Sequence, residues 1–232
     1  MDISITNVLL DLGAGRRGTD MGPSAMHVAG LVPHLKALGH RVVDVASVSG
    51  ANSFENSEPG DPRARFLPTI ERTCREIADR VDADVEAGRF PLVLGGDHAQ
   101  AIGTISGMAR AYRRRGQRVG VVWVDAHTDM NTPDTTISGN IHGMPLAALL
   151  GYGPPELVQL AGDEPALLPE NVAIIGVRDV DRSETSLVTK TGVRVFTMSE
   201  LDERGTALCV REAFEHVSKA SAGVHLSFDL DG

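Results

Sequence analysis

Seven short runs of apolar residues recur along this chain of 232 residues, and most of them are separated by stretches long enough for a helix. The runs are rich in Val and Ile and are continuous rather than alternating, which is typical of strands buried on both faces of a parallel sheet. They occupy residues 3–10, 41–45, 91–94, 119–124, 172–175, 193–196 and 224–228. We therefore expect seven parallel strands that are connected by helices.

The stretches between these runs complete the predicted fold. Three of them have helical length and period, at residues 23–38, 65–87 and 98–115. Residues 47–62 and 125–141 interrupt the alternation and are predicted to be loops, the first a surface connection or, alternatively, a lid. The pattern predicts an α/β fold, a three-layer α/β/α sandwich with a mostly parallel central sheet, in a single domain of residues 1–232.

Composition excludes several classes of protein. With 42% hydrophobic residues the chain is not disordered, and its net charge of −9 argues against nucleic acid as a partner. The two cysteines, Cys74 and Cys209, do not form a CxxC pair, so a reducing compartment is the simplest inference. The sequence begins without the features of a signal peptide, and no apolar run approaches the roughly 18 residues of a membrane span. We expect a cytoplasmic protein that binds no membrane.

Three of the predicted strands end in acidic or imidazole side chains. GGDH (residues 95–98) follows the third run, DAHTD (125–129) the fourth, and DLD (229–231) the seventh. In open α/β sheets ligands bind just outside the carboxyl ends of the strands, and residues i and i+2 of an extended backbone point the same way. We therefore expect the three motifs to converge and to bring together two imidazoles and four carboxylates.

Such a cluster indicates a metal site. Four carboxylates in contact cannot all stay ionised without cations, and two divalent ions would balance them. Mixed oxygen and imidazole ligands suit Mn²⁺ or Zn²⁺ rather than Ca²⁺, and a paired site generates hydroxide near neutral pH, which indicates hydrolysis. Taken singly, each motif could be a turn or a helix cap, so the metal hypothesis depends on the conjunction of all three.

The same motifs, the last of them extended to SFDLDG (residues 227–232), resemble those of the ureohydrolase superfamily and, within it, the arginases. DLG (11–13) and MGPS (21–24) are similar to the opening of arginases, and the resemblance continues to the last residue. It implies an arginase/deacetylase-like fold with two Mn²⁺ ions. It also implies that a hydroxide bridging these ions attacks the guanidinium carbon of L-arginine to give L-ornithine and urea.

The resemblance also implies roles for individual residues. The implied metal ligands are His98 and Asp129 for one ion, His127 and Asp231 for the other, and Asp125 and Asp229 as bridges. Asp129 would also orient the hydroxide, and His142 matches the proton-shuttle histidine of the family, a role suited to a group that titrates near neutrality.

A substrate pocket is implied by two further segments. An α-carboxylate needs neutral donors beside metal-ligating carboxylates, and the loop 131–140 is similar to that of arginases at the residues that could supply them. The implied carboxylate-binding residues are Asn131, Thr136, Ser138 and Asn140. In the second segment Asp181 would receive the α-amino group, with Asp179 and Glu184 supporting it.

The chain departs from the family pattern at its end, because arginases continue well beyond the position of Gly232. We therefore expect a domain that lacks its C-terminal portion, with exposed apolar surface and a poorly anchored final strand. Two alternatives stay open: an agmatinase or other guanidino-hydrolase, and a catalytically weak fragment that acts as an interaction subunit. The resemblance suggests a homo-oligomer. Trp123 is interpreted as core packing.

Overall fold

The computed structural model describes residues 1–49 and 58–232, and this part of the chain contains the seven expected strands, all of them parallel to their neighbours. One sheet has the order β2-β1-β3, with β1 Asp2–Leu9, β2 Arg41–Ser49 and β3 Phe90–Leu94. The other has the order β6-β5-β4-β7, with β4 Val119–Val124, β5 Val172–Val177, β6 Arg194–Thr197 and β7 Gly223–Phe228. The strands thus hydrogen-bond in two groups rather than in one continuous sheet.

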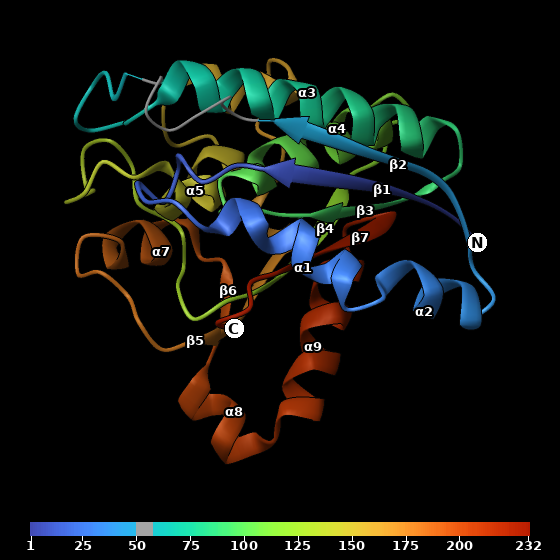
Figure 1. Cartoon of the computed structure of the whole chain (residues 1–232). Coiled ribbons are helices and arrows are strands. Elements are labelled where there is room, and N and C mark those ends of the chain that lie inside the picture. The colour runs from blue at the N-terminus through green and yellow to red at the C-terminus, as the bar shows by residue number, and fades with distance from the viewer. Residues whose placement is uncertain (50–57) are drawn as a thin grey trace.

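Helices cover both faces of the strands, as expected for a three-layer fold (Figure 1). One face carries α3 Leu67–Glu86 and α4 Gln100–Arg113. The other carries α1 Gly22–Val28, α2 Leu31–Ala37, α8 Met198–Arg204 and α9 Thr206–Ser218. Shorter elements border the carboxyl ends of the strands or connect them: α5 Pro145–Leu149, α6 Pro155–Val158, α7 Thr185–Thr191, η1 Thr19–Met21, η3 Ile141–Gly143, η4 Gln159–Ala161 and η5 Pro169–Asn171.

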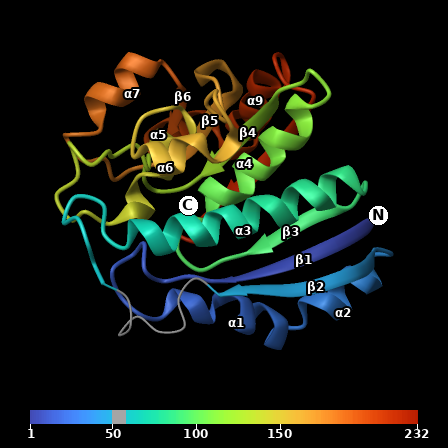
Figure 2. The ribbon, with the colours of Figure 1, turned by 90° about the horizontal axis from the view of Figure 1, so that it is seen from above.

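Helix α4 is held tightly against α3, and the two lie side by side in Figure 2. A Cβ atom at Gly103 would lie 2.4 Å from the carbonyl oxygen of Cys74, and one at Gly107 would lie 2.4 Å from that of Ala78. Only glycine allows the two backbones to approach this closely. The close packing holds α4 in place directly after the GGDH motif, which precedes the first residue of this helix.

Most predicted boundaries agree with the structure, with two corrections. The helix expected at 23–38 is two helices, because Gly30 adopts a left-handed conformation (φ 89°) between α1 and α2. The loop expected at 47–62 begins later, since β2 pairs with β1 as far as Ser49, and residues 50–57 lie outside the described residues. Residues 125–140 form a loop, as predicted.

The two sheets meet at their carboxyl ends. His98 follows β3 in the first sheet, and its Nε2 lies 2.8 Å from the Oγ of Ser227 in β7 of the second. Strand β7 pairs with β4 along its whole length, while its side chains Leu226 and Phe228 are exposed. The expected apolar exposure is therefore present at the last strand, but the expectation that this strand is poorly anchored is wrong, because all of its residues pair with β4. Within the described ranges, we find no helix with the length and apolar character needed to cross a membrane.

Candidate metal centre

All the side chains predicted for the metal centre, the proton shuttle and the substrate pocket line a single cavity of about 350 Å³. The cavity opens at the carboxyl ends of β4 and β7, so segments about a hundred residues apart in sequence meet there. The predicted residues that line it are His98, Asp125, His127, Asp129, Asn131, Thr136, Ser138, Asn140, His142, Asp179, Asp181, Glu184, Asp229 and Asp231.

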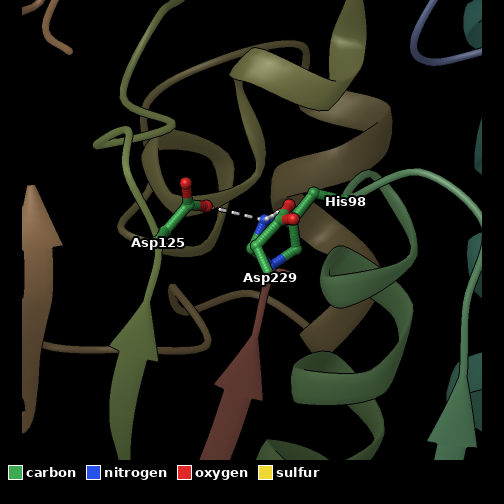
Figure 3. A group of neighbouring side chains, drawn as sticks. All are labelled: His98, Asp125 and Asp229. Atoms are coloured by element: carbon green, nitrogen blue, oxygen red, sulfur yellow. Dashed lines mark ion pairs between the residues drawn. The ribbon is translucent and has the colours of Figure 1, made fainter. Parts of the chain in front are cut away.

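His98 lies at the centre of the first group of ligands (Figure 3). Its Nδ1 lies 2.9 Å from Asp125 Oδ2, 3.0 Å from Asp129 Oδ2 and 3.3 Å from Asp229 Oδ2. The buried atoms His98 Nδ1 and Asp129 Oδ2 have no well-aligned hydrogen bond within the described part of the chain. The convergence of three carboxylates on one buried imidazole nitrogen, without hydrogen bonds of good geometry to satisfy these atoms, fits a cation at this point.

A second group of possible ligands lies beside the first. His127 Nδ1 lies 3.2 Å from Asp125 Oδ1 and 3.4 Å from Asp231 Oδ2, and the ligand atoms of the three residues all lie within 4.8 Å of one another. Asp125 belongs to both groups, with one carboxylate oxygen directed to each. The donors therefore fit two cations that share Asp125.

Trp123 contacts the ligands of the first group and does more than pack in the core. Its indole is fully buried and stacks on the imidazole of His98, with 4.2 Å between the ring centroids. The Nε1–H of Trp123 donates a hydrogen bond of 3.1 Å to Asp125 Oδ2. The i, i+2 spacing of Trp123 and Asp125 was a signal that could have predicted this contact. Ser227, at the far side of His98, also had no predicted role.

Asp129 adopts a backbone conformation that is unusual for a residue other than glycine. Its φ is 51°, in the left-handed region. Such strain costs roughly 1–3 kcal/mol and persists only where the surroundings hold it. Here the carbonyl oxygen of Asp129 accepts hydrogen bonds from the N–H groups of Leu146 (3.1 Å) and Ala147 (3.3 Å), in the first turn of α5. Helix α5 therefore helps to fix the carboxylate beside His98.

The cluster shifts the pKa values of its members in different directions. Burial would lower the pKa of His98, but the carboxylates of Asp125, Asp129 and Asp229 outweigh it and raise this pKa well above 6.5. Burial raises the pKa of Asp129 to about 7. Burial would also raise the pKa of Asp125, but His98 lowers it, and His98 lowers that of Asp229 as well. Without cations the group therefore retains protons near neutral pH, and cations can replace these protons.

The predicted substrate residues form a polar wall on two loops. Asn131 Nδ2 donates to Asp181 Oδ2 (3.1 Å), which joins the loop 131–140 to the loop after β5. Glu184 is buried, and its carboxylate accepts the backbone N–H groups of Met130 (2.9 Å) and Asp181 (3.2 Å). Burial is the main reason that its pKa is raised. Asp181 and Asp179 are exposed. The buried carboxylate of Glu184 thus joins the two loops that carry the predicted substrate residues.

The remaining predicted residues lie at the other side of the cavity. The Oγ of Ser138 accepts the N–H of Asn140 (3.2 Å), and Thr136 Oγ1 accepts the N–H of Gly139 (3.0 Å). His142 lies in η3, and its backbone N–H donates to Gly13 O (3.2 Å). Burial, together with the nearby imidazoles, lowers the pKa of His142. This side of the cavity thus combines hydroxyl and amide groups with a neutral imidazole.

Comparison with known proteins agrees with the sequence motifs. A sequence model described as "Arginase family" matches residues 1–232. An arginase from Bacillus caldovelox is 46% identical over 230 residues, which cover 99% of this chain and 76% of that protein.

Solved structures give the same result. The crystal structure of an arginase from Bacillus cereus matches with a TM-score of 0.91 at 44% identity, covering 100% of this chain and 76% of that one. The structure of Entamoeba histolytica arginase in complex with L-ornithine matches with a TM-score of 0.88 at 30% identity, covering 99% of this chain and 76% of that one. These matches extend over the motifs that build the cavity, and the chain belongs to the arginase family of hydrolases.

Proposed function

We propose that this chain hydrolyses L-arginine to L-ornithine and urea with two Mn²⁺ ions. The observation that carries the proposal is the pair of ligand groups that share Asp125 at one cavity. Membership of the arginase family supports the reaction, and the Entamoeba histolytica relative that binds L-ornithine supports the product.

The proposed ligands follow the two groups. His98 and Asp129 would hold one ion, His127 and Asp231 would hold the other, and Asp125 and Asp229 would be shared, as the position of Asp125 in both groups supports. When bound, the two ions supply Lewis acidity that generates hydroxide near neutral pH. Oxygen and imidazole donors without a thiolate are a set that suits Mn²⁺.

Two side chains would move the protons of the reaction. Asp129 Oδ2 is buried 3.0 Å from His98 Nδ1, where this carboxylate would orient the attacking water and accept a proton from it. The imidazole of His142 lies in the wall of the same cavity, and its pKa is lowered chiefly by burial. A neutral imidazole can pick up a proton from solvent and deliver it to the leaving amine.

Substrate recognition would depend on neutral donors at one end and on acidic groups at the other. The hydroxyl of Ser138 accepts a hydrogen bond from the chain, so its own proton stays available for a carboxylate. We assign the α-carboxylate to the amide and hydroxyl groups of the loop 131–140, namely Asn131, Thr136, Ser138 and Asn140. The α-amino group would bind Asp181, whose loop is held by Glu184, with Asp179 at the rim.

Urea release tests this function directly. The chain is loaded with Mn²⁺ and given L-arginine or agmatine, which lacks the α-carboxylate, and a metal-free sample serves as control. We expect Mn²⁺-dependent release, with L-arginine preferred about tenfold or more because agmatine leaves the neutral donors unpaired. Equal rates on both substrates would contradict the α-carboxylate pocket and favour an agmatinase or another guanidino-hydrolase. Absence of release from either would contradict the proposed activity of this chain.

We further propose that the chain works as a homo-oligomer in the cytoplasm, as the resemblance to its family suggests. Light scattering of the purified chain tests the assembly, and a multiple of the monomer mass is expected. A monomer mass at micromolar concentration would contradict it. Fractionation of the source cells tests the location.

A further inference from the structure

Asp97 has no role in the function proposed above, although it is adjacent to His98. Its side chain is 4% exposed and lies in the turn between β3 and α4. Asp97 Oδ1 accepts the N–H of Ala99 (3.0 Å), and Oδ2 accepts the N–H of Ala14 (3.2 Å), a residue 83 positions away. A carboxylate in this place therefore joins the turn that carries His98 to the loop after β1.

The loop approaches Asp97 at a distance that only glycine permits. A Cβ atom at Gly13 would lie 2.4 Å from Asp97 Oδ1. The backbone N–H of Gly13 lies near enough to this carboxylate to oppose the rise of its pKa that burial causes. Gly13 and Ala14 thus both lie against Asp97, and the N–H of Ala14 donates to it.

The carbonyl groups of the same two residues hold the other side of the cavity. Gly13 O accepts the backbone N–H of His142 (3.2 Å), and Ala14 O accepts Nδ2 of Asn140 (3.1 Å). Gly15 packs against Asn140 as well, because a Cβ atom there would lie 2.7 Å from Asn140 Oδ1. The segment Gly13–Ala14 therefore connects Asp97 to the turn 139–143.

We propose that Asp97 is a positioning residue, which holds the turn 139–143 against the cavity through Gly13 and Ala14. In this way one buried carboxylate sets the distance between the His98 side of the cavity and the turn that carries Asn140 and His142. The expected effect on substrate binding rests on the function proposed above. The role of Asp97 in holding the turn 139–143 does not depend on that function.

Helix capping is the competing explanation, since Asp97 also accepts the N–H of Ala99 at the start of α4. The variant Asp97→Asn separates the two roles. Asn caps helices as well as Asp does, and its single oxygen can still accept the N–H of Ala99. Its amide nitrogen would then face the N–H of Ala14, which is a donor and cannot pair with it.

Steady-state kinetics with L-arginine make the first comparison. If Asp97 positions the turn, Asp97→Asn should raise KM about tenfold, and Asp97→Ala should do the same, because a charge-assisted hydrogen bond is lost. If Asp97 only caps α4, Asp97→Asn should match the unsubstituted chain, and this result would overturn the proposal. Asp84→Asn is the matched control, since Asp84 is 3% exposed, lies 3.0 Å from Arg89 and is remote from the cavity.

Gly13→Ala tests the same connection without changing a charge. Gly13 does not have the left-handed backbone that an alanine would strain, so the substitution acts mainly through its Cβ. The added atom should push the loop away from Asp97 and raise KM in the same way. An unchanged KM in this variant would count against the proposal.

Hydrogen exchange supplies a readout that does not depend on activity. In Asp97→Asn the amides of Ala14 and His142 should both exchange about tenfold faster than in the unsubstituted chain, while Asp84→Asn should leave both unchanged. Faster exchange at Ala14 alone would mean that Asp97 does not hold the turn, and the proposal would fail. If the unsubstituted chain releases no urea, the proposed function fails, but the exchange comparison still decides the role of Asp97.

Discussion

The two ligand groups differ in how far the protein encloses them. In the first group, which we call the buried half, the side chains of His98, Asp125 and Asp129 are 7%, 1% and 8% exposed, while that of Asp229 is 36% exposed. In the open half, His127 and Asp231 are 46% and 48% exposed. Asp125 belongs to both groups, and its side chain is as deeply buried as that of His98 in the first group.

The two groups also differ in the number of neighbouring residues that hold their ligands in place. In the buried half, His98 is held between Trp123 and Ser227, and α5 fixes the backbone of Asp129. In the open half, Asp231 Oδ1 accepts the N–H of Ala126 (3.2 Å), while its Oδ2 lies beside an exposed imidazole. Since ligands held by further contacts bind metals more tightly, we expect the buried half to bind its cation first. The open half should bind and release its cation more easily.

The largest effect should come from the residue that the halves share. Asp125→Ala removes a donor from both groups, so we expect loss of both Mn²⁺ ions and a fall in urea release of about a thousandfold or more. Elemental analysis of the purified variant gives the metal content, and Asp84→Asn is the control. A variant that keeps both ions would refute the shared ligand.

A smaller effect is expected from a residue outside both halves. His142→Asn should lower kcat about a hundredfold and leave the Mn²⁺ content unchanged, because His142 would move a proton rather than bind metal. Metal analysis and kinetics on one preparation check both parts. Loss of an ion from this variant would place His142 among the ligands and break the division into two halves.

Trp123→Phe tests the support of the buried half. Phenylalanine can keep the stacking on His98 but lacks the N–H that donates to Asp125. We expect the affinity for the first Mn²⁺ to fall about tenfold and the second to change less. Calorimetric titration of the metal-free chain measures both steps. Equal weakening of the two steps would mean that Trp123 supports the site as a whole.

The sequence patterns predicted the parts of this architecture that depend on local order. Continuous apolar runs identified seven strands, because strands buried on both faces need no polar alternation. Motifs at the ends of β3, β4 and β7 predicted the cavity, since parallel strands place their carboxyl ends together. The roles of single ligands stay predictions that the experiments above address.

The break at Gly30 had a local signal, since glycine commonly ends helices, but the helical period of the segment continues across it. Other features depend on contacts between distant residues and had no local signal. The contact of Asp97 with Ala14 joins residues 83 positions apart, and only the packed structure brings them together. The stacking of Trp123 on His98 likewise joins distant residues, whereas the hydrogen bond of Trp123 to Asp125 had a local signal in their i, i+2 spacing.

The smallest expected effect is a pH dependence of the metal-free chain. Carboxylates outweigh burial and raise the pKa values of His98 and His127, and a raised histidine pKa stabilises the fold fully only below the unfolded value of about 6.5. This contribution is lost as the pH rises through the folded-state values. Burial raises the pKa of Asp97 and of Asp129 to about 7, which acts in the same direction. We expect Tm in EDTA to fall by about 2–4 °C from pH 6.5 to 8.

Histidines with lowered pKa values do not reverse this sign, because above pH 6.5 they are mostly neutral in both the folded and the unfolded state. They are His142, His216 and His225. Saturating Mn²⁺ should reduce the fall, since cations replace the protons of the ligands His98, His127 and Asp129 but not that of Asp97. A Tm that rises with pH in EDTA would contradict the protonated cluster.

The most direct test is a titration of the metal-free chain with Mn²⁺ in which bound metal and urea release from L-arginine are measured on the same samples. The account predicts two unequal binding steps, assigned to the buried and the open half, with urea release appearing as the second step fills. Urea release at full rate with one bound ion, or from the metal-free chain, would contradict it.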